Sequence, residues 1–295
     1  MKKVAIVGAG ISGLYLANEL NKNTEIDYKI FEKKDYLNLN EGYGIQLSVN
    51  SINLLNKIGF KNISASDVYY PTKVNFFQAN NIKKICEIDL KQFNNVHDRY
   101  TTLKRSTLIK FLLDNIPEEK IQFRADIQNI EYNEKIKISW DNKNESFDYI
   151  VIADGVFSKL KTLISNNHLN PICNGNIALR ANLKQHEKDN ISIYMGSNFH
   201  YVTYPVNQKL EYNFVAIIKK KLTTKEIEDK NILNSETFIK SLKDFISKNS
   251  IINLESLANI KCFPVFVSTE LPTLKYQNTY LSGDALFAFP PSFAQ

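Results

Sequence analysis

Three glycines near the start of the chain have the spacing of a phosphate-binding turn. Gly8, Gly10 and Gly13 form the pattern G-x-G-x-x-G directly after the apolar residues 4–7 and before a stretch with helical spacing. In such a pattern the first glycine permits a tight turn, the second lets the backbone approach a pyrophosphate, and the third lets the helix lie close to the strand. Free N–H groups at the helix N-terminus then favour an anion. The residues expected to bind a dinucleotide at this turn are Gly8, Gly10, Ile11, Ser12 and Gly13.

An acidic residue follows this turn at the distance that a nucleotide site requires. Glu32 comes directly after residues 28–31, the second expected strand, about 20 positions beyond the motif, where an acidic side chain binds ribose hydroxyls. The combination predicts dinucleotide binding, and the alternative is a glycine-rich turn with no ligand. The motif alone does not distinguish NAD from FAD.

Two later motifs make that distinction. Asp154 and Gly155 follow the apolar residues 149–152, and Gly283 and Asp284 follow residues 279–281. With the first motif they resemble the flavin-dependent aromatic monooxygenases of the para-hydroxybenzoate hydroxylase type, in which three such motifs occur in this order and bind FAD together. The resemblance covers essentially the whole chain.

The resemblance implies a role for each acidic residue of these motifs and for one arginine. Asp284 is expected to accept hydrogen bonds from the ribityl hydroxyls of FAD, and Asp154 to shape the cofactor site and to be linked to the nicotinamide cofactor. Arg105 matches the arginine that meets FAD in the family. The alternative is a surface arginine at a helix N-terminus, a place that the helix dipole disfavours for a cation.

Two further segments resemble parts of the family's flavin site. Residues 42–50, with Gly44 and Gln46, match the segment beside the flavin ring. Ile127 takes the place of a hydrophobic residue that covers the adenine, and an ordinary core isoleucine is an equal alternative.

A histidine and a tyrosine provide the candidate catalytic pair. His200 and Tyr204, in the pattern H-x-x-x-Y-P, resemble the salicylate hydroxylase and 3-hydroxybenzoate 6-hydroxylase branch, where both side chains face the substrate. On a strand, alternate side chains share one face, so His200 and Tyr204 would lie together. His200 could then accept a phenolic proton while Tyr204 hydrogen-bonds the same ring. The alternative is a half-buried histidine with an ordinary aromatic neighbour.

The chain also departs from the family pattern. Leu286 and Phe287 stand where Ala-His is usual, and Lys161 stands where the second motif usually ends in arginine. A family-typical C-terminal segment that follows the third motif is expected to be missing, so the chain is interpreted as C-terminally truncated.

The resemblance implies an FAD-dependent monooxygenase that uses NADH or NADPH and O2 to hydroxylate a small aromatic substrate through a flavin hydroperoxide. The alternatives are another FAD oxidoreductase of this fold, such as an epoxidase or a lipid reductase, or a flavin-binding protein without catalysis. We expect no metal site, because the four histidines lack zinc-ligand spacing.

The elements expected around these residues define an α/β fold. A Rossmann-like FAD-binding domain with a parallel sheet, residues 1–71, 97–172 and 274–295, is interrupted by a mostly antiparallel β-sheet substrate domain, residues 72–96 and 173–273. In the substrate domain we expect a hairpin turning at Asn80-Asn81, strands at 177–183, 191–195, 200–204 and 212–218, and helices near 224–230 and 235–248.

Composition limits the other classes. The net charge of +6 comes from scattered lysines and arginines, whereas a nucleic-acid-binding protein would gather them in one patch. Three dispersed cysteines favour a reducing compartment. No apolar run is long enough to span a bilayer, and the chain begins with a strand in place of a signal peptide, so a cytoplasmic protein is expected. A homodimer remains open.

Overall fold

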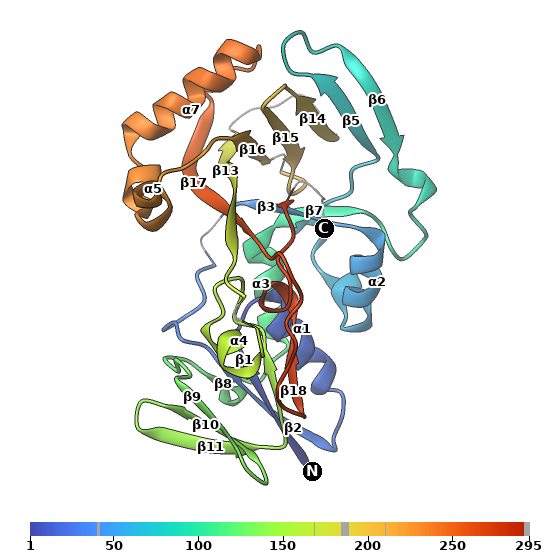
Figure 1. Cartoon of the computed structure of the whole chain (residues 1–295). Helices are drawn as coiled ribbons and strands as arrows, with labels where there is room; N and C mark the ends of the chain where they lie inside the picture. The colour runs from blue at the N-terminus through green and yellow to red at the C-terminus, as the bar shows by residue number, and fades with distance from the viewer. Residues whose placement is uncertain (40–41, 168, 184–188, 210, 292–295) are drawn as a thin grey trace. The chain divides into compact units, whose positions relative to one another are not determined.

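The computed structural model describes residues 1–39, 42–167, 169–183, 189–209 and 211–291. The chain divides into two compact units (Figure 1). The first contains residues 1–39, 108–172 and 266–290, and the second contains residues 40–107, 173–265 and 291–295. Among the described residues no helix is long and apolar enough to cross a membrane.

A five-stranded parallel sheet in the order β18-β12-β1-β2-β8 organises the first unit. Its strands are β1 Lys2–Val7, β2 Ile26–Phe31, β8 Ile121–Gln122, β12 Tyr149–Ile152 and β18 Thr279–Leu281. Its helices are α1 Ile11–Leu20, α3 Arg105–Asp114 and α4 Lys159–Ile164. The first three residues of α3 are grouped with the second unit, because the first unit resumes at Leu108. The central strand β1 is buried from residue 4 to residue 7, and β12 beside it alternates between half-buried and buried residues, as expected for a parallel sheet covered on both faces.

A second, antiparallel sheet completes the core of this unit. Its strands, in the order β11-β10-β9, are β9 Asn129–Tyr132, β10 Ile136–Trp140 and β11 Lys143–Phe147. Phe31 at the end of β2 meets Trp140 edge-on, with ring centroids 4.9 Å apart. Apolar residues of both sheets therefore form one core beside the carboxyl ends of the parallel strands.

A seven-stranded mixed sheet in the order β17-β13-β16-β15-β14-β5-β6 forms most of the second unit. The strands are β5 Lys73–Gln78, β6 Lys84–Asp89, β13 Ile172–Leu183, β14 Ile191–Met195, β15 Phe199–Pro205, β16 Tyr212–Lys219 and β17 Leu257–Val267. The helices are α5 Thr224–Glu228, α6 Lys230–Leu233 and α7 Glu236–Asn249. Phe238, Leu242 and Ile246 of α7 are buried against the sheet, so α7 covers one of its faces (Figure 1).

A small antiparallel sheet, β3-β7-β4, belongs to the same unit. It contains β3 Gly44–Leu47, β4 Val68–Tyr69 and β7 Thr101–Lys104, and α2 Val49–Lys57 follows β3. The Thr102 hydroxyl donates a hydrogen bond of 2.5 Å to the Pro205 carbonyl at the end of β15. β7 is thereby fixed to the large sheet.

The expected fold class is confirmed: a Rossmann-like domain with a parallel sheet is combined with a mostly antiparallel second part. The hairpin at residues 80–81 is present between β5 and β6. The helix expected near 224–230 is instead two short helices, because Asp229 ends α5 and caps α6 through the Asn231 N–H. Contacts group residues 40–71 and 97–107 with the second unit, whereas the sequence pattern assigns them to the first.

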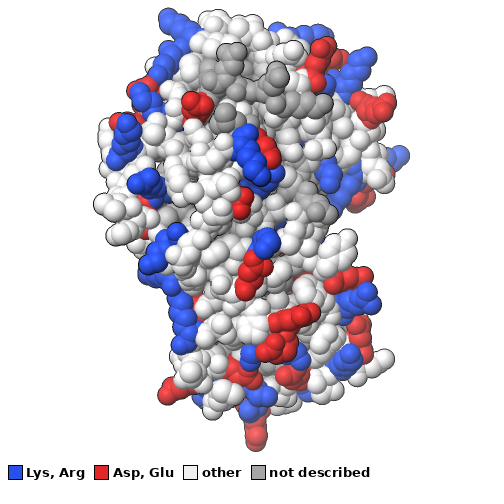
Figure 2. Space-filling model, turned by 180° about the vertical axis from the view of Figure 1, so that it is seen from behind, with Lys and Arg blue, Asp and Glu red and all other residues white. Residues whose placement is uncertain are grey.

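Charged side chains are spread over the face shown in Figure 2, where lysines and arginines alternate with aspartates and glutamates. Ten ion pairs are described, and most of their lysines are well exposed to solvent. Exposed pairs of this kind contribute little to stability. Because both signs of charge are mixed on that face, the positive net charge is not gathered in one patch there.

Candidate cofactor and substrate sites

The glycine turn has the geometry that its spacing predicts. Gly8 has φ +107°, and a Cβ there would lie 2.4 Å from the Ala153 carbonyl oxygen. A Cβ on Gly13 would lie 2.0 Å from the Gly8 carbonyl oxygen, so α1 can approach β1 this closely only with glycine at that position. Gly10 differs, because nothing lies within 4 Å of its Cβ position. Gly10 is also the N-cap of α1, without a side-chain cap, so the helix N-terminus faces open space.

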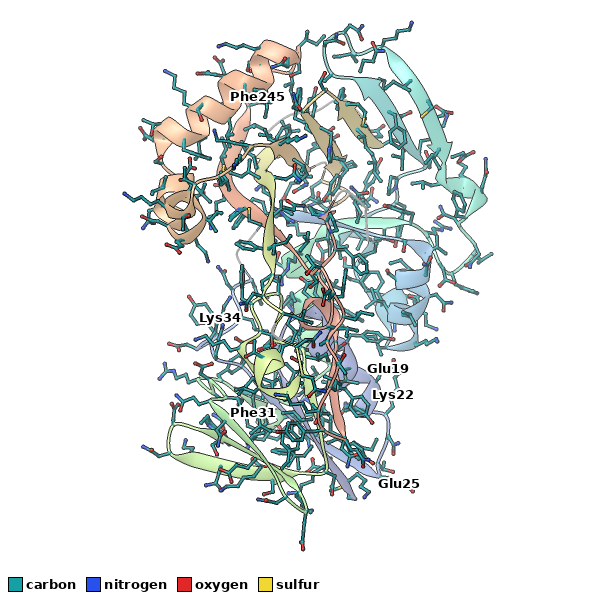
Figure 3. The ribbon with its side chains drawn as sticks, in the orientation of Figure 1. Glu19, Lys22, Glu25, Phe31, Lys34 and Phe245 are labelled. Atoms are coloured by element: carbon teal, nitrogen blue, oxygen red, sulfur yellow. The ribbon has the colours of Figure 1, made fainter. Side chains whose placement is uncertain are left out.

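Glu32 lies at the carboxyl end of β2 and points back to this turn. One carboxylate oxygen accepts a hydrogen bond of 2.9 Å from the Ala9 backbone N–H, and the other accepts one of 3.0 Å from the Lys34 N–H. The residue is 8% exposed. Figure 3 labels Phe31 and Lys34, which bracket Glu32 along the chain. The carboxylate is thus fixed beside the glycine turn and retains lone pairs for a further donor.

The three sequence motifs meet at one edge of the parallel sheet. The Ala153 N–H, at the end of β12, donates to the Val7 carbonyl at 2.7 Å. The hydroxyls of Ser12 and Ser282 lie 2.6 Å apart, and the Cβ position of Gly283 is 3.0 Å from the Ser12 Cβ. The third motif is therefore fixed to the first turn of α1. Because strands β1, β12 and β18 are parallel, their following loops come together at the carboxyl edge.

Two acidic residues at this edge, Asp154 and Asp284, are held in surroundings that disfavour their charge. Burial raises the pKa of Asp154, and its Oδ1 has no hydrogen-bond partner among the described residues. The pKa of Asp284 is also raised by loss of hydration, although its side chain still reaches the surface. Lys161 is 3% exposed, and burial lowers its pKa while Asp154 opposes the shift. Gly155 has φ +88° and open space at its Cβ position.

Two other residues predicted to contact the cofactor, Ile127 and Arg105, have no hydrogen bond or ion pair with the three motifs among the described residues. Ile127 is 7% exposed within the core that includes Trp140, which agrees with the core alternative, while a contact with adenine stays a prediction. Arg105 begins α3 in the second unit, and its backbone N–H donates to the Tyr43 carbonyl at 2.8 Å. A shared role for Arg105 and Asp284 stays a prediction.

Gly44 and Gln46 lie on β3, against the large sheet of the second unit. The Gly44 N–H donates to the Asn213 side-chain oxygen at 2.7 Å, and its Cβ position lies 2.8 Å from the Tyr204 ring. Only glycine lets β3 approach β15 and β16 so closely. Gln46 accepts a hydrogen bond of 2.9 Å from the Tyr100 hydroxyl.

Tyr204 is deeply buried beneath β3. It is 3% exposed, burial strongly raises its pKa, and its hydroxyl is hydrogen-bonded to Gln46. Tyr100 completes this chain of side chains, and burial raises its pKa to about 12. Tyr204 thus positions Gln46 in this structure, and direct contact with a substrate stays a prediction.

His200 lies on β15 on the same side as Val202 and Tyr204, as the alternation predicts. The imidazole is half-buried, and loss of hydration lowers its pKa below the ordinary value of 6.5. The neutral ring that this favours can accept a proton at neutral pH. A half-buried base on an apolar sheet face suits proton removal from a phenol.

Arg180 was not predicted as a site residue from the sequence pattern. It lies on β13, half-buried, and its positive charge acts on the Tyr204 hydroxyl. The only sequence signal is a single arginine in an otherwise apolar and amide-rich strand, and its neighbours on other strands become visible only with the strand order.

The carboxyl edge of the first unit fits the dinucleotide part of FAD. It offers open space at Gly10, uncapped N–H groups of α1, a fixed carboxylate at Glu32 and an unpartnered carboxylate oxygen at Asp154. These groups suit a pyrophosphate and hydroxyl groups respectively.

Comparison with known proteins gives matches to flavoenzymes. Residues 6–40 match the family model of the NAD(P)-binding Rossmann-like domain. The chain is 23% identical over 237 residues to salicylate hydroxylase from Pseudomonas putida, covering 72% of this chain and 54% of that protein. It is 26% identical over 167 residues to the FAD-dependent monooxygenase dpfgE of Gibberella zeae, covering 54% of this chain and 35% of that protein.

Solved structures share the fold. Klebsiella pneumoniae HpxO, in complex with FAD and uric acid, superimposes with a TM-score of 0.81 at 16% identity, covering 100% of this chain and 75% of that one. A salicylate hydroxylase substrate complex gives a TM-score of 0.76 at 17% identity, covering 99% of this chain and 75% of that one. The chain spans between about a third and a half of the length of the two curated relatives named above.

Proposed function

We propose that this chain, which belongs to the FAD-dependent monooxygenase family, binds FAD at the carboxyl edge of its parallel sheet and hydroxylates a small aromatic substrate on its seven-stranded sheet. The observation that carries the proposal is the meeting of three motifs at that edge, with the Glu32 carboxylate fixed beside the glycine turn. The half-buried His200 on a largely apolar sheet face supports the substrate part.

Each group at the carboxyl edge has a distinct task in holding FAD. The N–H groups at the start of α1 would bind the pyrophosphate, which Gly10 leaves room to approach, and Glu32 would accept hydrogen bonds from the ribose. Asp284, with Gly283, would accept hydrogen bonds from the ribityl chain. When bound, FAD reduced by NADH or NADPH supplies the activation of O2.

The second unit would orient and activate the substrate. His200 would accept the phenolic proton at its neutral imidazole, which makes the aromatic ring electron-rich. Val202 and Val215 offer an apolar surface to the ring and help to exclude water. Tyr204 and Tyr100 hold Gln46 in place at the border of that surface.

We also propose a reducing, cytoplasmic location, supported by the free state of Cys86, Cys173 and Cys262. A homodimer stays a prediction.

The proposal is tested by following NADH or NADPH consumption and the fate of isotopically labelled O2 with a phenolic acid such as salicylate. Monooxygenation predicts one labelled oxygen atom in the product and oxygen-dependent consumption that the phenolic acid stimulates. Consumption without a labelled product would favour another FAD oxidoreductase. Bound FAD with no substrate-stimulated consumption would favour a non-catalytic flavin-binding protein.

A further inference from the structure

One edge of the seven-stranded sheet is formed by a strand that is exposed along nearly its whole length. Among the described residues β6 pairs only with β5, and it lies at the outer margin of the second unit (Figure 1). All its residues except Asp89 are exposed. An edge strand carries a row of backbone N–H and C=O groups that can pair with a further strand. β6 is therefore a place where another chain can extend this sheet.

The pairing with β5 shows which backbone groups of β6 point outward. The Leu90 N–H donates to the Thr72 carbonyl at 2.9 Å, one position beyond the β5–β6 ladder. Hydrogen-bonded and non-hydrogen-bonded positions alternate along an antiparallel pair. Ile88 therefore turns its N–H and C=O groups toward β5, whereas Glu87 and Asp89 turn theirs away from the sheet. Glu87 and Asp89 are the residues that a further strand would bond.

A β-bulge gives β6 a face on which all the side chains are charged. The register with β5 shifts at Ile85, which is the extra residue. Lys84 thereby lies on the same face as Glu87, with which it forms an ion pair, and Lys73 of β5 pairs with the same carboxylate at 2.8 Å. Asp89 lies two residues from Glu87 and shares this face. Two lysines and two acidic residues leave the charged face without net charge.

The other face of β6 is apolar. Cys86 and Ile88 lie on it, next to the bulged Ile85, and Ile85 and Ile88 are 54% and 43% exposed. Two more exposed apolar side chains flank the strand, Ile82 in the turn before it and Phe93 after it. Exposed apolar side chains gathered in this way mark a surface that a partner covers.

A second copy of the chain is complementary to this edge. A dimer with twofold symmetry places the same patch of both copies in contact. Antiparallel pairing centred on Glu87 joins the outward backbone groups of one Glu87 to those of the other copy. It also brings Lys84 of each copy beside Asp89 of the other, which adds an ion pair at each end. The two Glu87 carboxylates face one another, but each keeps its ion pairs with Lys73 and Lys84, which hold its pKa at about 2.

The same register covers the apolar face. Ile88 of one copy lies opposite Cys86 of the other, and the antiparallel order brings Ile82 of one copy toward Phe93 of the other. These side chains then leave water, which stabilises the pair in proportion to the apolar area that is covered. Charged and apolar side chains therefore match in one register.

We propose that two copies of the chain join their seven-stranded sheets edge to edge, through antiparallel pairing of β6 centred on Glu87. The partner is a second copy because the charges of β6 are complementary to themselves in this register. The proposal concerns an interaction surface and depends neither on FAD nor on the proposed function.

The first test measures self-association of the full chain by sedimentation equilibrium. We expect a concentration-dependent dimer with a dissociation constant in the micromolar range, because pairing of one short strand covers a small interface. Ile88→Lys places a charge on the apolar face and should weaken the dimer about 10–100-fold, because each dimer loses two apolar contacts. Leu54→Lys is the matched control, because Leu54 of α2 is similarly exposed, at 46%, and should leave the dimer unchanged.

The second test exchanges the charges at the two ends of the pairing. Lys84→Glu and Asp89→Lys each set like charges side by side, so each variant alone should dimerise about 10-fold more weakly. An equimolar mixture of the two variants restores opposite charges at both ends and should dimerise as the wild-type chain does. A purely structural effect of either substitution would not be rescued by mixing.

Three results would overturn the proposal. The first is a wild-type chain that stays monomeric up to about 1 mM, whether or not β6 pairs with an extended peptide of another protein. The second is a dimer that Ile88→Lys leaves unchanged. The third is a mixture that associates no more tightly than its two components.

Discussion

The Glu32 carboxylate and the Ala9 backbone N–H are joined by a hydrogen bond of 2.9 Å, across the two parallel strands that begin the chain. This bond connects the acid at the end of β2 with the glycine turn at the end of β1. A ligand that touches the helix N-terminus at Gly10 is therefore within reach of a fixed carboxylate. Glu32 and the glycine turn, which the sequence relates only by their spacing, therefore lie side by side in the structure.

Removal of this carboxylate should release FAD. Glu32→Ala takes away the acceptor for the ribose and leaves the Ala9 and Lys34 N–H groups without their partner. We expect FAD affinity to fall about 10–100-fold, as for lost hydrogen bonds to a charged group. Flavin absorbance after gel filtration measures this. The matched control is Glu19→Ala, because Glu19 pairs with Lys22 at the surface (Figure 3) and should not affect flavin content. Equal flavin content in both variants would remove Glu32 from the site.

In the flavin-free chain at neutral pH, the buried charge of the Asp154 carboxylate should lower the free energy of unfolding. Burial raises its folded-state pKa above the ordinary 3.8, so its contribution to stability is full below that pH and is lost as pH rises through the folded pKa. Asp154→Asn should thus raise the melting temperature at pH 7 and have little effect near pH 3. Thermal unfolding followed by circular dichroism measures both.

Asp148 provides the control with the opposite sign. Its carboxylate accepts a 2.7 Å hydrogen bond from the Lys3 N–H, which lowers its pKa. Asp148→Asn should therefore lower the melting temperature at pH 7. A decrease in both variants would show that the Asp154 charge is compensated in the folded chain.

Proton acceptance by His200 should limit hydroxylation at low pH. Burial lowers its pKa below 6.5, so the imidazole is neutral at pH 7 and gains its proton only at lower pH. The same shift means that its contribution to stability is present above about pH 6.5 and lost as pH falls through the folded pKa. NMR titration of the histidines should give His200 a pKa below that of a free imidazole, and hydroxylation should decline over the same range.

Replacement of the base tests its role directly. His200→Asn should lower the hydroxylation rate about 10²–10⁴-fold while FAD binding and flavin reduction persist, with reducing equivalents released as hydrogen peroxide. His97→Asn is the control, since His97 is exposed. Wild-type hydroxylation in His200→Asn would show that the substrate is activated in another way.

Local patterns predicted the first unit well. The glycine turn, Glu32 and the strand before each motif depend on residues close in sequence, or on the rule that parallel strands place their carboxyl ends together. The positions of Gly8, Gly13 and Glu32 follow from these constraints alone, and the structure agrees with them.

The second unit was less predictable because its site depends on strand order. The burial of Tyr204 under β3 at Gly44 could not be predicted from the local pattern, and its contact with a substrate stays a prediction. Arg180 was missed because β16 separates β13 from β15, and only the strand order and register place it in one row with Val215 and Val202. Residues 40–71 join the second unit through the contacts of β3, which no local pattern reveals.

The FAD content of Gly10→Ala, compared with wild type and Gly13→Ala, shows whether the pyrophosphate lies against the start of α1. Nothing lies within 4 Å of the Gly10 Cβ position and its φ is −79°, so the variant should fold with an unchanged melting temperature in the absence of flavin. Gly13→Ala places a Cβ 2.0 Å from the Gly8 carbonyl and should destabilise the fold itself. If the pyrophosphate lies against Gly10, the wild-type chain retains FAD through gel filtration and Gly10→Ala loses it while staying folded. Full flavin retention by Gly10→Ala, or no flavin binding by the wild-type chain, would show that the glycine turn does not hold FAD.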